Sequence, residues 1–115
     1  MKYLLMVYGN EQAMMALSKE AMETAQAGYT AYNEALKKAG ILAGFNRLRP
    51  TKSASMVRVS DGKTSVLDGP YAETKEQLGG YFLIDVPDLD AALSWAARCP
   101  GASHGAVEVR PVWEM

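Results

Sequence analysis

Two stretches of this 115-residue chain are apolar at consecutive rather than alternate positions, and they constrain the fold more than any other feature. They read KYLLMVY at residues 2–8 and GYFLIDV at residues 80–86. Both are short and rich in aromatic and aliphatic side chains, which is typical of β-strands. Successive side chains of a strand point to opposite faces of the sheet. A strand that is apolar on both alternations, and therefore on both faces, has to be covered on both of them. The fold must therefore supply two layers of cover for one sheet.

Helical spacing predicts two helices between the strands. The first spans residues 18–39, with Ser18 as a suitable N-cap and Gly40 as a stop signal. The second follows Asp88, another good N-cap, and ends before the Cys-Pro-Gly at residues 99–101. Side chains at steps of three and four form one apolar face on each helix. These faces comprise Met22, Ala25, Tyr29, Tyr32 and Leu36 in the first helix and Leu89, Ala92, Leu93 and Ala96 in the second.

The clearest local signal is a β-hairpin. Two β-rich runs at residues 56–59 and 64–67 flank Asp61-Gly62, and glycine accepts the positive φ that a tight hairpin turn demands. A short extended segment precedes this hairpin and is closed by Pro50. The last strand lies in GAVEVRPVW, where Pro111 places the strand's end at a sheet edge or beyond the ladder.

The resulting order is β-α-β-β-α-β with one additional strand, which predicts an α+β, ferredoxin-like fold with an antiparallel sheet. We interpret residues 1–115 as a single domain because no linker or composition shift divides them. Both helices would cover the same face of the sheet. Since no chain remains to cover the second face, we expect a homodimer that packs sheet to sheet through an isologous interface.

Composition excludes several classes of function. The net charge of −1 argues against direct nucleic-acid binding. No apolar run approaches the length of a membrane span, the first strand is too short for a signal-peptide core, and a single cysteine suits a reducing compartment, so we expect a cytoplasmic protein. One histidine and one cysteine do not make a transition-metal set, and phosphate-binding glycine loops are absent. We therefore predict no metal and no cofactor.

The connection DGPYAETKEQLGG at residues 68–80 is longer and more polar than a turn needs to be. A solvated helical turn would explain any one of its charges, but the whole group suits hydrogen bonding to a small polar molecule or proton transfer. We predict catalytic roles for Asp68, Glu73 and Glu76 and ligand-binding roles for Tyr29, Tyr71, Thr74, Lys75 and Gln77. Three arginines can also bind an anion, although such residues more often form surface salt bridges. They are Arg47, Arg49 and Arg58.

The string DGPYAETKEQLGGYFLIDV strongly resembles the signature of the YCII-related superfamily in its DGPF-domain branch, which reads close to DGPFAETKEQLGGF. Tyr71 and Tyr81 replace the phenylalanines, and MKYLLMVYGN, LKKAGILAG and GAVEVRPV are similar as well. The resemblance implies a dimeric α/β-barrel. YciI-type relatives carry a proposed catalytic His–Asp pair with the histidine in the first helix. That position falls near Tyr29 here, and the first helix contains no histidine.

Two functional hypotheses follow. The first is a small-molecule enzyme or binding protein whose pocket is walled by the loop at residues 68–77. The second is a non-catalytic interaction module that contacts a regulatory partner, because the resemblance implies an association with extracytoplasmic-function sigma factors.

Overall fold

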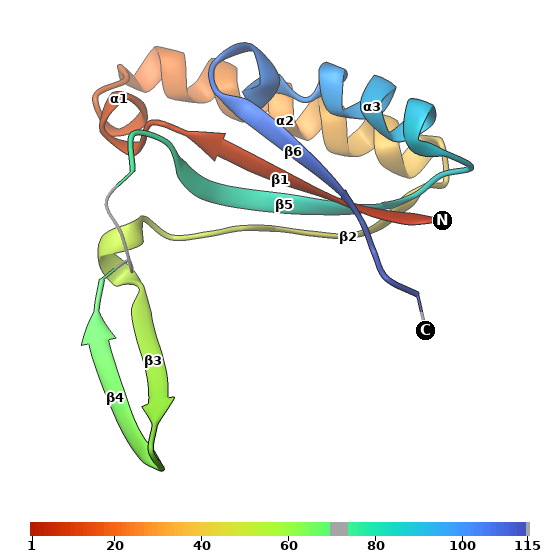
Figure 1. The fold of residues 1–115 in the computed structure, drawn as a ribbon. Coiled ribbons are helices and arrows are strands. Elements are labelled where there is room, and N and C mark those ends of the chain that lie inside the picture. The colour runs from red at the N-terminus through yellow and green to blue at the C-terminus, as the bar shows by residue number, and fades with distance from the viewer. Residues whose placement is uncertain (70–73, 115) are drawn as a thin grey trace.

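The computed structural model describes residues 1–69 and 74–114, so the predicted roles of Tyr71 and Glu73 lie outside the described residues. The strands are β1 (Lys2–Gly9), β2 (Leu42–Arg47), β3 (Ser55–Ser60), β4 (Lys63–Asp68), β5 (Gln77–Asp85) and β6 (Ala106–Pro111). The helices are α1 (Glu11–Met15), α2 (Lys19–Lys38) and α3 (Leu89–Arg98), with 3-10 turns η1 (Thr51–Ser53) and η2 (Pro100–Ser103). Along the chain the strands and α-helices follow the order β1-α1-α2-β2-β3-β4-β5-α3-β6 (Figure 1).

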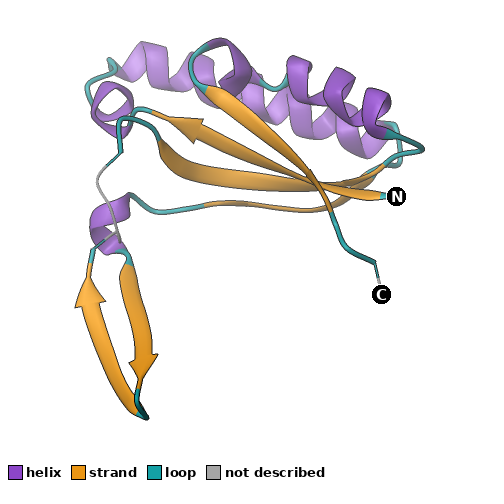
Figure 2. Ribbon diagram, in the orientation of Figure 1, coloured by secondary structure: helices purple, strands orange, loops and turns teal. Residues whose placement is uncertain are grey.

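Four strands form the main sheet in the order β2-β5-β1-β6, and every neighbouring pair is antiparallel. This is the strand order of the ferredoxin-like fold, so the α+β prediction is confirmed. The two strands that are apolar on both alternations, β1 and β5, occupy the centre of the sheet. Helices α2 and α3 lie together on one face, and the opposite face has no helix over it (Figures 1 and 2).

The hydrophobic core lies between this sheet and the two helices. Its buried members are Tyr3, Leu5, Tyr32, Leu36, Phe82, Ile84, Val86, Ala92, Ala96 and Cys99. Tyr32 joins the layers, because its ring packs edge-on against Phe82 at a centroid distance of 5.2 Å and its hydroxyl donates to the carbonyl of Trp95 at 2.7 Å. A buried tyrosine with its polar end satisfied contributes its full apolar area to the core.

The helix boundaries agree with the predicted caps. The hydroxyl of Ser18 accepts from the backbone N–H of Ala21, and the carboxylate of Asp88 accepts from that of Ala91. Gly40 has a φ of +72°, a left-handed conformation that follows many helix C-termini. These short-range signals therefore set where α2 and α3 begin and end.

The predicted apolar faces are partly wrong. Met22 is 45% exposed because the first two turns of α2 lie largely in solvent and only its second half packs on the sheet. Leu89 and Leu93 are each 47% exposed. The buried stripe of α3 is centred instead on Ala92 and Ala96, whose small side chains let the helix approach the sheet closely.

The hairpin forms as predicted but stands apart from the main sheet. Asp61 and Gly62 have φ values of 51° and 73°, and positive φ at both central residues is the geometry of a type I′ turn. Strands β3 and β4 pair only with each other, as a separate two-stranded sheet. We call residues 55–68 the arm. It projects from the body on the side opposite the helices (Figure 1).

Strand β5 begins three residues earlier than predicted, at Gln77. Its pairing with β1 passes from Val7 opposite Gly80 to Tyr8 opposite Leu78, which leaves Gly79 as the extra residue of a bulge. The glycine pair of the long connection therefore lies inside the ladder.

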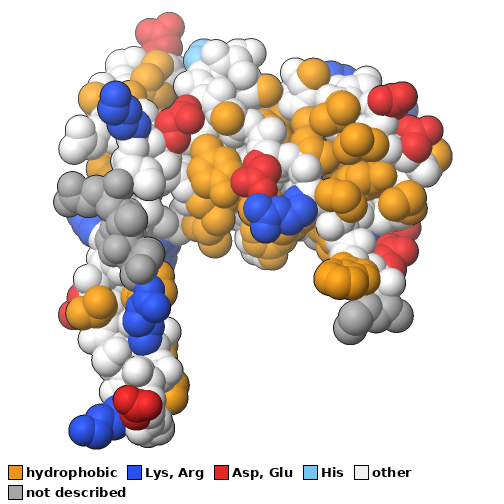
Figure 3. Space-filling model, in the orientation of Figure 1, with side chains coloured by type: hydrophobic (Ala, Val, Ile, Leu, Met, Phe, Trp, Pro, Cys, Tyr) orange, Lys and Arg blue, Asp and Glu red, His pale blue; other side chains and the backbone are white. Residues whose placement is uncertain are grey.

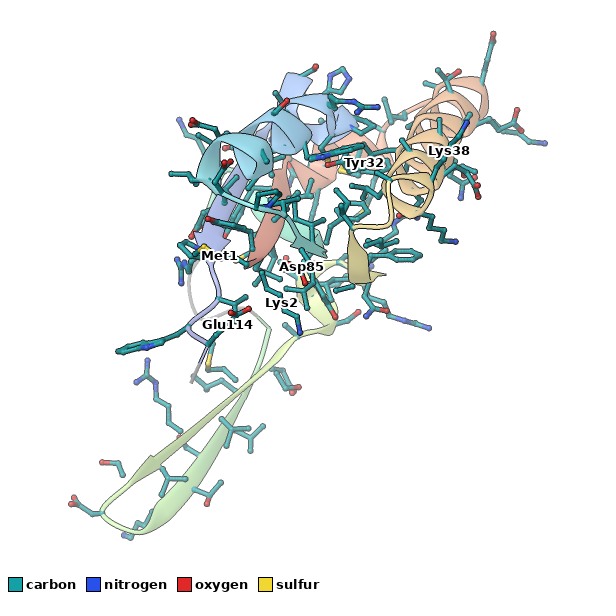
Figure 4. All side chains as sticks on the ribbon, turned by 90° about the vertical axis from the view of Figure 1, so that its right-hand side faces the viewer. Met1, Lys2, Tyr32, Lys38, Asp85 and Glu114 are labelled. Carbon is teal, nitrogen blue, oxygen red and sulfur yellow. The ribbon has the colours of Figure 1, made fainter. Side chains whose placement is uncertain are left out.

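The chain ends meet at the far end of the sheet from the arm. The N-terminal ammonium of Met1 donates to the carboxylate of Asp85 at 3.1 Å, and the backbone N–H of Lys2 donates to Glu114 at 3.3 Å (Figure 4). Both partners of the ion pair are exposed, so it adds little to stability. Strand β6 lies at the sheet edge, as Pro111 indicated.

A matched pair of leucine substitutions tests the location of the core. Leu36→Ala removes a fully buried side chain and should lower the free energy of unfolding by roughly 2–5 kcal/mol. Leu93→Ala, also in a helix but half exposed, should cost less than about 1 kcal/mol. Urea unfolding at one protein concentration measures both, and equal losses would contradict the burial pattern.

Candidate functional site

The polar side chains at the end of the long connection are bonded to backbone groups. The side-chain oxygen of Gln77 accepts from the backbone N–H of Glu11 at 2.9 Å, and its amide nitrogen donates to the carbonyl of Thr74. The hydroxyl of Thr74 donates to the carbonyl of Glu76 at 2.6 Å. Thr74 and Gln77 thus hold this part of the loop in shape and tie it to α1.

Glu11 extends this network to the root of the arm. Its carboxylate accepts from both the backbone N–H and the hydroxyl of Thr51, each at 2.8 Å. Hydrogen bonds to an ionised group are stronger than neutral ones. Sequence reasoning missed Glu11, because residues 11–17 show no clear period. Its position after Asn10, which caps α1, was the one available signal.

An open depression of about 290 Å3 lies between β2 and η1, lined by Arg47, Leu48, Arg49 and Pro50. Its wall is attached to the glycine pair, since the backbone N–H of Leu48 donates to the carbonyl of Gly79 at 2.8 Å. At Gly80 a Cβ would lie only 2.8 Å from the carbonyl oxygen of Asn46, so the two backbones pack closer than a side chain would allow. Two of the arginines considered for anion binding thus lie beside the signature.

Two of the predicted catalytic carboxylates, Asp68 and Glu76, belong to the described residues and lie elsewhere on the surface. Asp68 ends β4, and the Asp68, Lys75 and Glu76 side chains are all exposed. None of the three lines the depression. The structure therefore does not gather them around one cavity, and their proposed roles stay predictions.

Tyr29 lies away from the loop, in the layer between α2 and the sheet. Its half-buried ring stacks on Phe82 with centroids 6.4 Å apart, and Phe45 stacks on the same ring at 6.0 Å. One helical turn further along, the side-chain oxygen of Asn33 is buried without a hydrogen-bond partner among the described residues. Tyr29 and Asn33 share the sheet-facing side of α2.

The hydroxyl of Tyr29 lies against Gly101, where a Cβ would come within 2.7 Å of the oxygen. Burial raises the pKa of Tyr29 to about 12, and the neighbouring Cys99 thiol acts in the same direction, whereas Arg47 acts in the opposite one. Because the phenol is held neutral, Tyr29 is suited to donate a hydrogen bond at neutral pH and not to act as a base.

Neither Cys99 nor His104 builds a second site. Cys99 is buried in the core, where it packs as a small hydrophobic residue, and its burial raises the pKa of the thiol. His104 is exposed in the loop after η2. Within residues 1–69 and 74–114, no three His, Cys, Asp or Glu side chains gather in a group that could hold a metal ion. In the same residues, no helix is both long and apolar enough to span a bilayer.

Comparison with known proteins places the whole chain in one family. The YCII-related domain matches residues 1–115. The chain belongs to the YCII-related family. A relative of this YCII-related protein in Rhizobium meliloti (strain 1021), described as an uncharacterised protein, is 43% identical over 114 residues, which cover 97% of this chain and 92% of the relative. The prediction of the YCII-related family is thereby confirmed, whereas the DGPF branch stays a prediction and the activity has to be argued from the site.

The raised pKa of Tyr29 predicts how the stability of this YCII-related protein depends on pH. Folding favours the neutral phenol, so this stabilisation is complete below pH 10 and is lost as the pH rises towards 12. Tyr29→Phe cannot titrate. The wild-type advantage in unfolding free energy over this variant should be constant from pH 8 to pH 9.5 and shrink above pH 10. Urea unfolding across this range measures it, and a constant difference up to pH 11.5 would contradict the assignment.

Proposed function

We propose that this YCII-related protein is a homodimer that binds a small anionic molecule at the depression lined by residues 47–50. The observation that carries the proposal is the attachment of this arginine-containing depression to the glycine pair of the signature through the Leu48–Gly79 hydrogen bond. Guanidinium groups match carboxylate and phosphate geometry through paired hydrogen bonds. A volume of about 290 Å3 lies near the lower limit of ligand sites, so the ligand is expected to be small.

The uncovered face of the sheet supports the dimer. Tyr3 and Leu5 of β1 are buried beneath the helices, so the alternate residues Leu4 and Met6 point to the opposite face. There they stand across from Leu83 and Tyr81 of β5 in the ladder. This apolar centre at the middle of the sheet is the surface that a second copy would bury, giving the two-sheet barrel that the family resemblance implies.

The end of the loop, at residues 74–77, is joined to the neighbourhood of the proposed site by the network of Glu11, Thr51 and Gln77. In this proposal Lys75 does not line the depression and would contribute positive charge only by approaching the bound anion. Asp68 and Glu76 are the candidates for proton transfer, which would require them to approach the bound molecule. Assignment to the DGPF branch rests on the motif that begins at Asp68 and is proposed on that basis.

A non-catalytic interaction module, with a sigma-factor-related protein as its partner, is the second candidate function. The observation that favours it is the arm, which exposes the apolar side chains Val57, Val59, Val66 and Leu67. The two candidates differ in what should stabilise the protein: a small anion in the first case and a protein partner in the second.

A thermal-shift screen with inorganic phosphate and small mono- and dicarboxylates tests the anion site. At least one of these anions should raise the Tm of the wild type, because ligand that binds only the folded state stabilises it by mass action. The double variant Arg47→Ala/Arg49→Ala should bind that anion at least about tenfold more weakly, since tenfold corresponds to about 1.4 kcal/mol.

Lys19→Ala, which removes an exposed positive charge at the start of α2, is the matched control and should respond like the wild type. Equal shifts in the wild type and the arginine variant, or no shift with any anion at millimolar concentration, would refute the proposed site.

Sedimentation velocity at micromolar concentration tests the dimer. The wild type should sediment as a dimer, and Leu83→Glu should be monomeric because it places a charge in the apolar centre of the open face. Leu93→Glu, on the outer surface of α3, is the control and should leave the dimer intact. A monomeric wild type would refute the proposed assembly.

A further inference from the structure

We propose that the arm clasps the partner protomer, with the valine face formed by Val57, Val59 and Val66 packed against the flank of a second copy. This inference rests on the proposed dimer and adds to it a second contact surface outside the sheet. It assigns a function to a hairpin that the ferredoxin-like core does not need.

The arm exposes more apolar surface than an element of this size can leave in water without cost. Val57 and Val66 are each 59% exposed and Val59 is 68% exposed. Val57 stands directly opposite Val66 in the ladder and Val59 is two residues further along, so the three side chains share one face. Because an isolated two-stranded hairpin is at best marginally stable in water, the arm needs a surface to pack against.

The arm and the open face of the sheet lie on the same side of the molecule and meet at a corner (Figure 1). The overall extents of 47 × 44 × 19 Å fit a thin, L-shaped protomer. Figure 3 shows hydrophobic side chains along the side of the arm that faces the space beneath the sheet. A copy seated on the open face would occupy this corner and touch both surfaces at once.

The length of the arm suits this arrangement. Each arm strand has six residues, which corresponds to about 20 Å. Packed sheets lie about 10 Å apart, so the arm extends beyond the plane of a partner's sheet and reaches its side. The contact would therefore lie on the flank of the partner and not within the sheet-to-sheet layer.

The area of the interface points to the same conclusion. Four strands about 4.8 Å apart and about 20 Å long present roughly 400 Å2, whereas a stable interface buries about 800 Å2 per partner. One face of the arm offers about 200 Å2 more. In a twofold dimer each protomer buries one face of its own arm and also the patch of its flank that the partner's arm covers. Together with the sheet face, these two surfaces bring the buried area of each partner close to that of a stable interface.

The side chains on the valine face indicate which kind of partner packs against the arm. Residues on this face are Ser55, Val57, Val59, Thr64, Val66 and Asp68, whereas Arg58 and Lys63 point to the other side of the hairpin. A face with one acid at its root and no base suits an apolar protein surface and not a nucleic acid. A second copy offers such a surface and covers both arms by symmetry.

Sedimentation equilibrium on two double variants tests the clasp. Val57→Gln/Val66→Gln places two polar side chains on the valine face and should raise the dimer Kd at least tenfold. Ser60→Gln/Ser65→Gln makes the same side chains on the opposite face and should change the Kd by less than about twofold. An unchanged Kd in the valine variant, or equal weakening by both variants, would overturn the clasp.

Hydrogen exchange on the wild type tests it without substitutions that disturb the hairpin. Backbone amides of β3 and β4 should be better protected above the dimer Kd than below it. A wild-type dimer whose arm exchanges equally fast at both concentrations would overturn the clasp and leave the proposed dimer standing. A wild type that is monomeric throughout would overturn both.

Discussion

The antiparallel pairing of β1 with β5 is the constraint on which the rest of the structure depends. Both strands are apolar on both alternations, and their inward residues Leu5 and Ile84 are completely buried. Helices α2 and α3 cover one face of this pair, and within residues 1–69 and 74–114 no helix lies over the other face. The other face of the pair and the valine face of the arm are the apolar surfaces on which the proposed dimer rests.

The described contacts of the polar connection before β5 are structural. Gly79 forms a bulge in the central ladder, Gly80 allows close packing against β2, and Gln77 joins the loop to Glu11 and thereby to the root of the arm. These contacts hold three distant parts of the chain together next to the depression. In the proposed function, these contacts fix the wall of the depression that is lined by Arg47, at the end of β2, and by Arg49 just after it.

Prediction from sequence succeeded where the cause is local. Ser18, Asp88 and the Asp61-Gly62 turn act within a few residues, and each forms the structure that its chemistry favours. It failed for Met22, Leu89 and Leu93, because a helical period shows that an apolar face exists and not how far the sheet extends beneath it. Glu11 was missed because the partner of its carboxylate, Thr51, lies 40 residues away in the chain.

By itself the sequence determined the strands, the two longer helices, their order and the family, because propensities, caps and alternation are properties of short segments, whereas α1 was not predicted. Only the tertiary structure decided that Arg47 and Arg49 lie beside the glycine pair, that Asp68 and Glu76 do not share a cavity with them, and that the hairpin leaves the sheet as an arm. These outcomes depend on contacts between residues far apart in the chain. Such contacts are set by how layers and backbones pack, which no short segment encodes.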